Sequence, residues 1–293
     1  MSVRISINGQ MFAKEDAKVS VYDHGFLYGD GVFEGIRCYN RRIFRHQQHL
    51  DRLFESAQAI DLTIGRTREE VRQAVKETVR ANGFDDCYIR LVVTRGVGDL
   101  GLSPSKCYGG PTLIVIADKI QLYPEEKYRE GMEIVTVTTR RNSPDVLNPA
   151  IKSLNYLNNI LAKIEVNRVK AEEGLMLNQH GLVAECTGDN VFLVKRGVLL
   201  TPSVDQGILV GVTRGVVIEI ARELGVPVRE GPMSLLEVYT ADECFLTGTG
   251  AEVIPVVRID GRNLADGKPG PLSWRIIERY RELVAREGDP LDE

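Results

Sequence analysis

The sequence predicts a protein of mixed α/β class folded into two domains. The chain has 293 residues, which is enough to form two hydrophobic cores and more than a single small core requires. Its first third alternates short β-patterned runs with two amphipathic helical stretches. A polar, charged segment over 124–131 then interrupts the pattern, as a connection between domains does. We therefore expect a smaller N-terminal domain over 1–123, a linker over 124–132 and a larger C-terminal domain over 133–293.

The N-terminal domain is predicted to be a compact unit of strands and two helices. Asn8-Gly9, the strongest short signal for a hairpin turn, follows the first apolar run. The spacing of Leu50, Leu53 and Ala57 predicts a helix over 46–59. Thr67, followed by two acidic residues, favours a second helix that continues to about residue 81. The predicted strands cover 3–7, 18–22, 32–39, 43–44, 87–94 and 112–117.

The C-terminal domain is predicted to contain further strands and two clear helices. A strand over 133–138 precedes a helix over Ser153–Lys170, whose apolar residues repeat at the spacing of one buried face. Two hairpins turn near 179–181 and 195–197, and a helix over 213–224 is closed by glycine. The predicted buried face of the first helix consists of Leu154, Leu157, Leu161 and Ile164.

The composition excludes several classes of function. The formal net charge of −4 offers no basic surface for nucleic acid or an anionic membrane, and no apolar run approaches the ~18–20 residues that span a bilayer. The five cysteines are scattered without a C-x-x-C pair, and the four histidines form no ligand set, so we expect neither disulfides nor a metal site. The N-terminus lacks the pattern of a signal peptide, and we expect a cytoplasmic protein.

Two residues stand where a charged side chain can be placed for chemistry. Lys152 lies between a proline-containing loop and a strong helix, and a lysine held in a less polar site can act as a Schiff-base nucleophile. Glu185 ends a predicted strand, where a buried carboxylate needs a cationic partner. Taken singly, each also fits an ordinary surface residue.

Two further segments offer anion sites. The run Gly207–Arg214 ends in a helix N-terminus whose free N–H groups suit a phosphate, and Arg52 supplies a charge that can neutralise it. The small-residue turn Leu246–Gly250 has N–H groups that can hold a carboxylate. Taken alone, the helix start also fits a simple capped helix, Arg52 fits a surface arginine, and the small-residue turn fits a plain loop. The glycine-rich run Tyr28–Phe33 fits neither nucleotide-binding fingerprint.

Together and in this order, these segments resemble the class IV (fold type IV) pyridoxal-phosphate aminotransferases, whose fold is that of the D-amino-acid aminotransferases. Within that class the chain is most similar to the branched-chain amino-acid aminotransferases, over about Ile7–Arg281. The motifs that carry the resemblance are 28–37, Tyr88-Ile-Arg90, 95–98, 152–156, Glu185 with 187–190, 211–214 and 247–252.

The resemblance implies a pyridoxal 5'-phosphate cofactor in a cleft between the two domains. Lys152 would carry the cofactor aldehyde as a Schiff base and act as the catalytic base and acid. Glu185 would keep a proton on the pyridine nitrogen, and Tyr156 would bond the phenolic oxygen. The remaining cofactor-binding residues would be Arg52, Asn190, Leu209, Gly211, Val212, Thr213 and Thr249, most of them around the phosphate.

The resemblance also implies substrates and an assembly. An amino group would pass reversibly from L-leucine, L-isoleucine or L-valine to 2-oxoglutarate, in a homo-oligomer that is a dimer or a hexamer. Arg90 would meet the distal carboxylate of the glutamate side chain, and the turn of Gly248, Thr249 and Gly250 would hold the α-carboxylate. Glu34 and Arg37, three residues apart, would pair with each other. The pocket would be lined by Tyr28, Phe33 and Tyr88.

Alternative functions stay open at this point. The Lys-Ser-Leu-Asn run that begins at Lys152 also occurs in D-amino-acid aminotransferases, and a lyase or another transaminase can use the same scaffold. The chain has Arg90-Leu-Val92 where the D-enzymes usually carry an Arg-x-His carboxylate trap, which favours the L-enzyme. Thr249-Gly-Ala-Glu252 departs from the commoner Thr-Ala-Ala-Glu and indicates a looser carboxylate turn. A protein that binds pyridoxal phosphate without turnover is the non-enzymatic alternative.

Overall fold

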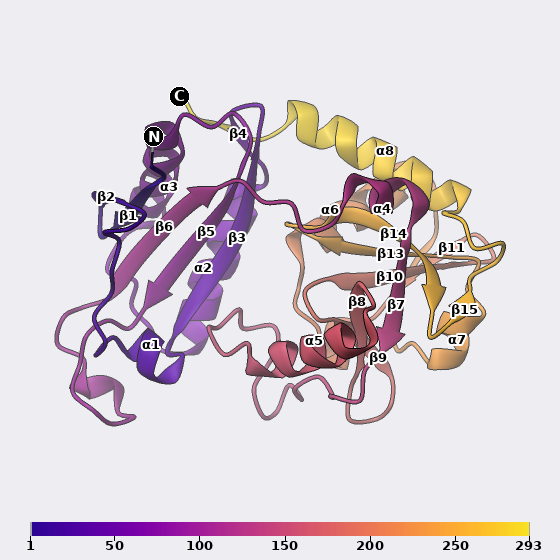
Figure 1. Cartoon of the computed structure of the whole chain (residues 1–293), viewed down its shortest axis with the longest axis horizontal. Helices are drawn as coiled ribbons and strands as arrows, with labels where there is room; N and C mark the ends of the chain where they lie inside the picture. The colour runs from indigo at the N-terminus through magenta and orange to yellow at the C-terminus, as the bar shows by residue number, and fades with distance from the viewer. Residues whose placement is uncertain (1, 293) are drawn as a thin grey trace. The chain divides into compact units, whose positions relative to one another are not determined.

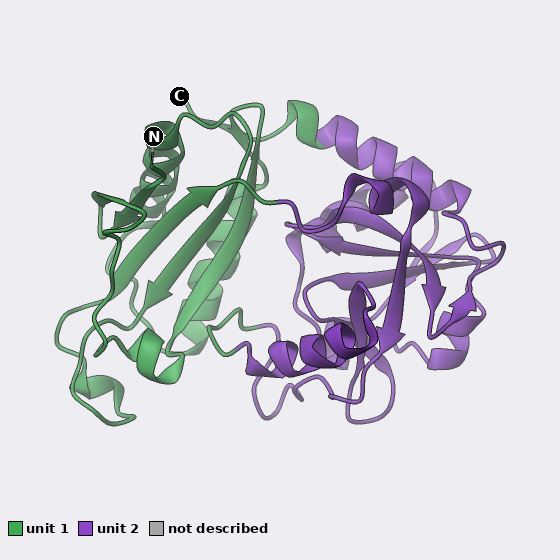
Figure 2. Ribbon diagram, viewed as in Figure 1, with its two compact units in different colours: residues 1–120, 151–155, 284–293 green, residues 121–150, 156–283 purple. Residues whose placement is uncertain are grey.

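The computed structural model describes residues 2–292 and divides them into two compact units (Figure 2). Unit 1 contains the chain up to Ile120, the segment Ile151–Asn155 and the segment from Val284 onward. Unit 2 contains Gln121–Ala150 and Tyr156–Leu283. The prediction of a linker over 124–132 and one continuous second domain is therefore wrong in detail. The polar run 124–131 holds a short helix, α4 (Glu125–Glu130), whose residues are all partly or fully exposed, so its charge reflects a solvated surface of unit 2.

Unit 1 is built on a seven-stranded antiparallel sheet (Figure 1). Its strand order is β16-β4-β3-β5-β6-β1-β2. Asn8 and Gly9 have φ angles of 51° and 87°, as a two-residue hairpin turn requires, and they connect β1 to β2. The predicted strand over 18–22 is irregular backbone followed by a turn. The strands are β1 (Arg4–Ile7), β2 (Gln10–Ala13), β3 (Gly31–Tyr39), β4 (Arg42–Ile43), β5 (Cys87–Thr94), β6 (Thr112–Asp118) and β16 (Asp289–Pro290).

Two helices cover one face of this sheet, α2 (His46–Ala59) and α3 (Arg68–Asn82). The helix over 46–59 was predicted at these bounds, and α3 begins with the capping box of Thr67 and Glu70. Strand β5 alternates between the two faces. Ile89, Leu91 and Val93 join the helices in the core, whereas the residues between them point to the opposite face. The remaining helical segments of unit 1 are α1 (His24–Tyr28) and the 3-10 turn Pro104–Lys106.

Unit 2 is built on a nine-stranded mixed sheet. The order β12-β11-β10-β13-β14-β7-β8-β9 includes parallel pairings of β14 with β7, β7 with β8 and β11 with β12, and β15 pairs with β14. The strands are β7 (Met132–Thr136), β8 (Glu173–Leu177), β9 (Val183–Cys186), β10 (Asn190–Lys195), β11 (Val198–Thr201), β12 (Val228–Glu230), β13 (Glu243–Gly248), β14 (Glu252–Ile259) and β15 (Arg262–Asn263). The helices are α5 (Leu157–Val169), α6 (Val212–Glu223), α7 (Leu235–Tyr239) and α8 (Pro271–Arg286), with a 3-10 turn at Val204–Gln206.

Helix α5 differs from its prediction in where it starts and in which face it buries. It begins at Leu157, and the residues packed on the sheet are Asn159, Ala162 and Val166. Val166 comes so close to the sheet that a Cβ on Gly174 would lie 2.6 Å from its Cγ2. The three helical residues of the predicted buried face are instead exposed, Leu157 by 65%, Leu161 by 47% and Ile164 by 41%.

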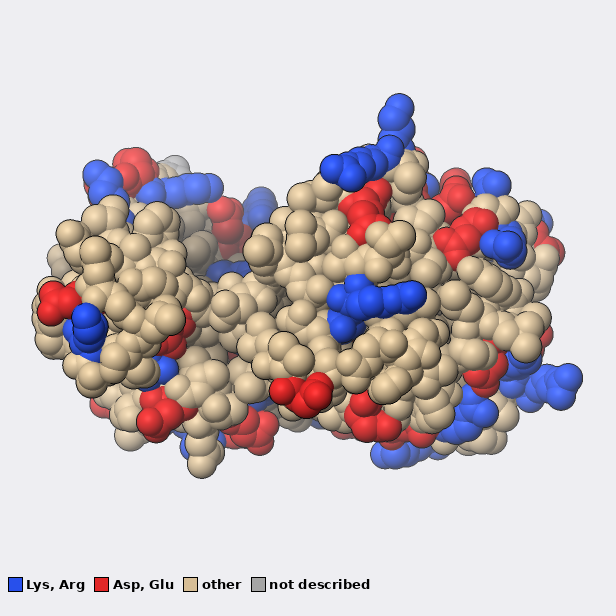
Figure 3. All heavy atoms as spheres, turned by 90° about the horizontal axis from the view of Figure 1, so that it is seen from below, with Lys and Arg blue, Asp and Glu red and all other residues tan. Residues whose placement is uncertain are grey.

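On the side of unit 2 on which α5 lies, a broad uncharged area surrounds a central group of Lys and Arg side chains, and most of the other charged side chains lie toward the edges of the view (Figure 3). Ile160 adds to the exposed apolar row, so four apolar residues at the spacing i, i+3, i+4, i+7 face outward along one side of the helix. An exposed apolar row of this kind is typical of a surface that another protein covers.

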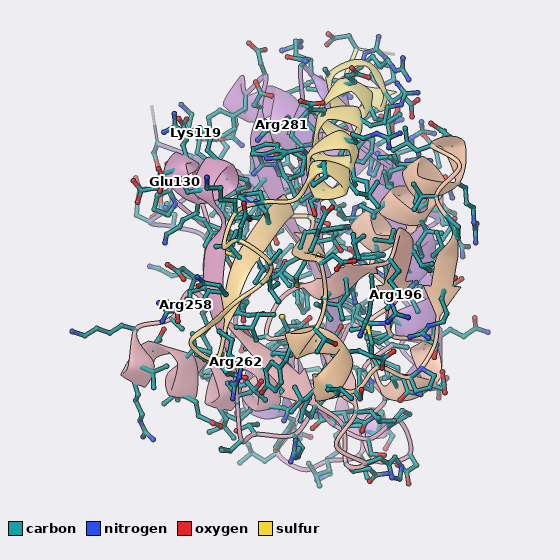
Figure 4. The ribbon with its side chains drawn as sticks, turned by 90° about the vertical axis from the view of Figure 1, so that its right-hand side faces the viewer. Lys119, Glu130, Arg196, Arg258, Arg262 and Arg281 are labelled. Atoms are coloured by element: carbon teal, nitrogen blue, oxygen red, sulfur yellow. The ribbon has the colours of Figure 1, made fainter. Side chains whose placement is uncertain are left out.

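Charged side chains cover other parts of the surface (Figure 4). Arg258 on β14 lies 3.5 Å from a carboxylate oxygen of Glu133, and Arg262 on β15 lies over the ring of Tyr239. Within residues 2–292, no helix combines the length and the apolar character that a membrane span requires.

Candidate active site

Lys152 is fixed at the edge of the unit 1 sheet. The backbone of 151–155 runs antiparallel to the start of β3, with Phe33 donating to the Lys152 carbonyl at 3.0 Å and Leu154 donating to the Gly31 carbonyl at 2.9 Å. The Lys152 N–H donates to the Ser56 hydroxyl on α2 at 3.1 Å, and its Nζ lies 4.5 Å from the centroid of the Phe33 ring. The backbone of this lysine is therefore held by both a strand and a helix, with the amine over an aromatic face.

A buried ion pair lies beneath β3, between the sheet and α2. Glu34 is fully buried and accepts bonds from Arg52 Nε at 2.7 Å and Arg52 Nη2 at 2.8 Å. His49 Nδ1 lies 2.7 Å from the same carboxylate. Burial raises the pKa of Glu34, but Arg52 and His49 outweigh it and hold the pKa at about 2. The expected pair of Glu34 with Arg37 is wrong, because successive residues of a strand alternate between faces and Glu34 points toward α2.

The opposite face of the unit 1 sheet carries three of the predicted substrate residues. Arg90 stacks on two aromatic rings, with its guanidinium carbon 4.6 Å from the Phe33 centroid and 5.4 Å from the Tyr88 centroid. Gly35 makes room for this cluster, since a Cβ there would lie 2.1 Å from the Tyr88 hydroxyl. Tyr28 is held by other contacts, on α1, where its hydroxyl accepts from the Gly101 N–H at 2.9 Å. The structure thus groups Phe33, Tyr88 and Arg90 and places Tyr28 in a separate set of contacts.

In unit 2, Glu185 is the centre of a second buried group. It lies on β9 and is 4% exposed, and Arg141 Nε donates to its Oε1 at 2.8 Å. The Leu209 N–H and Asn190 Nδ2 donate to its Oε2 at 2.9 and 3.1 Å. The sequence predicted that this carboxylate would need a cation, and the structure supplies Arg141, which was not predicted. The loop that carries Arg141 has no periodic pattern from which its burial could be inferred.

The predicted backbone anion site lies at the start of α6. Gly211 is the N-cap residue, and among the described residues no side chain caps the helix, so its first N–H groups are available to an anion. A Cβ on Gly211 would lie 2.1 Å from Asn190 Oδ1, so this close approach requires glycine. Asn190 Nδ2 also donates to the Leu209 carbonyl at 3.0 Å and fixes the loop before the helix. Leu209, Gly211, Val212 and Thr213 are thus brought together with Asn190 and Glu185.

The predicted carboxylate turn follows β13. A Cβ on Gly248 would lie 2.0 Å from Asp189 Oδ1, so glycine is required there too, and Thr249 and Gly250 continue the turn. Burial, reinforced by Glu173, raises the pKa of Asp189 to about 7. Tyr156 is the N-cap residue of α5 and is half-buried.

Comparison with known proteins identifies the family. The model of the family described as amino-transferase class IV matches residues 31–259, well over half of the chain, and the chain belongs to that family. A Methanocaldococcus jannaschii protein, provisionally named a branched-chain-amino-acid aminotransferase, is 50% identical over 98% of both chains. The crystal structure of the Escherichia coli branched-chain amino acid aminotransferase matches with a TM-score of 0.94 and 34% identity over 100% of both chains. The chain is accordingly a fold type IV aminotransferase of the branched-chain group.

A third relative, the T.th. branched-chain amino acid aminotransferase, has been solved with bound molecules. Its structure with pyridoxamine 5'-phosphate has a TM-score of 0.92 and 38% identity, and covers 97% of this chain and 95% of its own. The same enzyme in complex with N-(5'-phosphopyridoxyl)-L-glutamate has a TM-score of 0.90. The mixed α/β class and the fold type IV architecture predicted from the sequence are confirmed.

Proposed function

We propose that this aminotransferase moves an amino group reversibly between L-leucine, L-isoleucine or L-valine and 2-oxoglutarate, with pyridoxal 5'-phosphate bound through Lys152. The observation that carries the proposal is the placement of Lys152. Its backbone is fixed by β3 and Ser56, and its amine lies over the Phe33 ring. A lysine with a fixed backbone and a partly apolar surrounding is suited to covalent attachment of an aldehyde.

Unit 2 also contains groups that suit parts of such a cofactor. A carboxylate has about four lone-pair positions, and the donors on Glu185 use three of them, which leaves one on Oε1 for the N–H of a pyridinium ring. The N-terminus of α6, with Gly211 close to Asn190, suits a phosphate dianion. When bound, pyridoxal phosphate supplies an electron sink for the bonds at the substrate's Cα.

Each predicted cofactor residue has a defined task in this proposal. Glu185 would keep the proton on the pyridine nitrogen, and Tyr156 would bond the phenolic oxygen. Lys152 would hold the cofactor through its amine and would serve as base and acid for the proton at the substrate's Cα. The phosphate would be bound by Arg52 and by the segment of Leu209, Gly211, Val212 and Thr213, and Asn190 and Thr249 are also assigned to the cofactor.

Substrate binding is assigned to two groups. Phe33, Tyr88 and Tyr28 present apolar surface to a branched side chain, and Arg90, stacked on two of these rings, meets the distal carboxylate of glutamate. The turn of Gly248, Thr249 and Gly250 binds the α-carboxylate. A relative solved with a phosphopyridoxyl derivative of L-glutamate supports the L configuration.

We further propose a cytoplasmic homo-oligomer. All five cysteines are free thiols, as in a reducing compartment. The exposed apolar row on α5 supports association with a second copy of the chain.

The proposal is tested by the visible absorption of the full chain loaded with pyridoxal phosphate. L-valine added to one sample should abolish the yellow band, and D-alanine added to another should leave it unchanged. Loss of the band with D-alanine alone would instead assign the activity of a D-amino-acid aminotransferase. Lys152→Ala should show no such band and no turnover, and full turnover in that variant would overturn the role of Lys152.

A further inference from the structure

We propose that Glu34 is a positioning residue, which together with His49 holds the Arg52 guanidinium in the orientation that binds the cofactor phosphate. This inference rests on the proposed function, because it concerns the phosphate of pyridoxal phosphate. Glu34 itself would not contact the cofactor, and its carboxylate would act through Arg52.

The first support is the geometry of the pair. Arg52 Nε reaches Oε1 at 2.7 Å while Nη2 reaches Oε2 at 2.8 Å, so two parallel hydrogen bonds join the planes of the two groups. His49 Nδ1 reaches Oε2 at 2.7 Å. A guanidinium held by two of its nitrogens cannot rotate about its own axis without breaking both bonds. The Nη1 nitrogen lies outside this pair and has an orientation set by it.

The second support is the burial of the whole cluster. Glu34 is 0% exposed, His49 1% and Arg52 9%. A buried ion pair adds little net stability compared with apolar side chains of the same volume, because both charges lose their hydration. Stability is therefore a weak reason for a charged cluster at this place in a hydrophobic unit, and orientation of the arginine is a stronger one.

The third support is where Arg52 lies on α2. Ser56, one turn further along this helix and roughly 6 Å along its axis, accepts the backbone N–H of Lys152. The same helix therefore positions the arginine and the backbone of the lysine to which the cofactor is attached. The aldehyde and the phosphate are close substituents on one ring, so an arginine one turn away is well placed for the phosphate.

His49 is the third member of the buried cluster. It lies three residues before Arg52 on α2, so both side chains reach Glu34 from the same face of the helix. Burial lowers the pKa of His49 more than Glu34 raises it, so at neutral pH the imidazole acts as a neutral N–H donor. The carboxylate charge is thus left to Arg52, and His49 occupies the lone pair that would otherwise allow the carboxylate to turn.

The experiment compares two ligands that differ only in the phosphate. The dissociation constants of pyridoxal phosphate and of pyridoxal are measured for the full chain, freed of cofactor, and for Glu34→Gln. The introduced amide has one acceptor oxygen instead of two and turns an N–H group toward the arginine, so pyridoxal phosphate binding should weaken by roughly tenfold or more. Pyridoxal binding should change by less than about twofold, because pyridoxal lacks the phosphate dianion that Arg52 would bind. Glu77→Gln, at an exposed position of α3 in the same unit, is the matched control and should change neither constant.

A second variant covers the case in which Glu34→Gln does not fold. Arg52→Lys keeps the buried charge and loses the planar fork, so it should show the same phosphate-specific loss. Equal weakening of both ligands, or unchanged binding of pyridoxal phosphate in folded Glu34→Gln or Arg52→Lys, would overturn the positioning role. Failure of the wild-type chain to bind pyridoxal phosphate at all would instead overturn the proposed function, and this inference with it.

Discussion

At the scale of the residue, Glu165 shows how one carboxylate organises a loop. It lies on α5 and accepts from the N–H and the hydroxyl of Thr138, both at 2.7 Å, and from the Thr139 N–H at 2.9 Å. Partial burial raises the pKa of Glu165, but the bonds from Thr139 and Thr138 outweigh it and hold the pKa at about 2. The loop that follows β7 and leads to Arg141 is anchored by these bonds.

We predict that Glu165→Gln lowers the free energy of unfolding by about 1–2 kcal/mol at pH 7. A carboxylate whose folded pKa is lowered contributes stability above its unfolded pKa, about 4.3, and loses it as the pH falls toward 2. The difference between wild type and variant should therefore shrink between pH 5 and pH 2.5. Urea unfolding at a series of pH values measures it, and a difference independent of pH would contradict the assigned hydrogen bonds.

The sequence identified groups that carry chemistry more readily than the partners that hold them. Lys152, Glu185 and the start of α6 were assigned from motifs, because each lies in a short motif and these motifs follow one another along the chain in the order typical of the family. Arg141 and the link from Glu34 to Arg52 were missed. Both join residues distant in sequence, and the pairing depends on which face of a strand meets which helix. Spacing in one segment does not contain that information.

At the scale of the element, α5 shows where a periodic pattern misleads. Its apolar spacing predicted a buried stripe, and the same spacing turned out to face outward. Periodicity shows that one face of a helix avoids water, but not whether the chain itself or another molecule covers it. The side of α5 that packs on the sheet includes the small residue Ala162, and the sheet has Gly174 where Val166 comes close. Small residues allow this close approach.

We predict that the exposed row of α5 lies in the interface between copies of the chain. The double variant Leu157→Glu, Leu161→Glu places charges where they would lose hydration on association, so the mass in solution should fall toward that of one chain. Light scattering after gel filtration measures the mass, and circular dichroism checks that the helix content is retained. Asn167→Glu, at an exposed polar position of the same helix, should leave the mass unchanged. An unchanged mass in the double variant would place the interface elsewhere.

At the scale of the whole molecule, the strand near the C-terminus is tied into unit 1 by one carboxylate. Asp289 on β16 accepts from His46 at 2.7 Å, from Arg72 at 2.7 Å and from Lys76 at 2.9 Å. Partial burial raises the pKa of Asp289, but the bonds from His46, Arg72 and Lys76 outweigh it and hold that pKa far below its usual range. The two-unit organisation was predicted from the sequence, but the return of 284–292 to unit 1 was not, because it depends on where His46, Arg72 and Lys76 lie in the fold.

Asp289→Asn should destabilise the protein by about 3 kcal/mol at pH 7, because it leaves the buried Lys76 ammonium without its counter-charge. Since the folded pKa is lowered, the contribution is present above about pH 4 and is lost as the solution becomes more acidic. Asp292→Asn is the control, since that side chain is 67% exposed, and it should cost less than about 0.5 kcal/mol. Equal midpoints of urea unfolding for the two variants would show that the Asp289 cluster contributes nothing.

The three-part make-up of unit 1 also has a consequence for synthesis on the ribosome. Residues 284–293 emerge after every residue of unit 2, so a nascent chain can assemble its second sheet while the first still lacks an edge strand and the counter-ion of Lys76. During that interval, the part of unit 1 that is made first is incomplete and accessible to proteases and chaperones. Completion of unit 1, which also carries Lys152, therefore depends on residues that are made after the whole of unit 2.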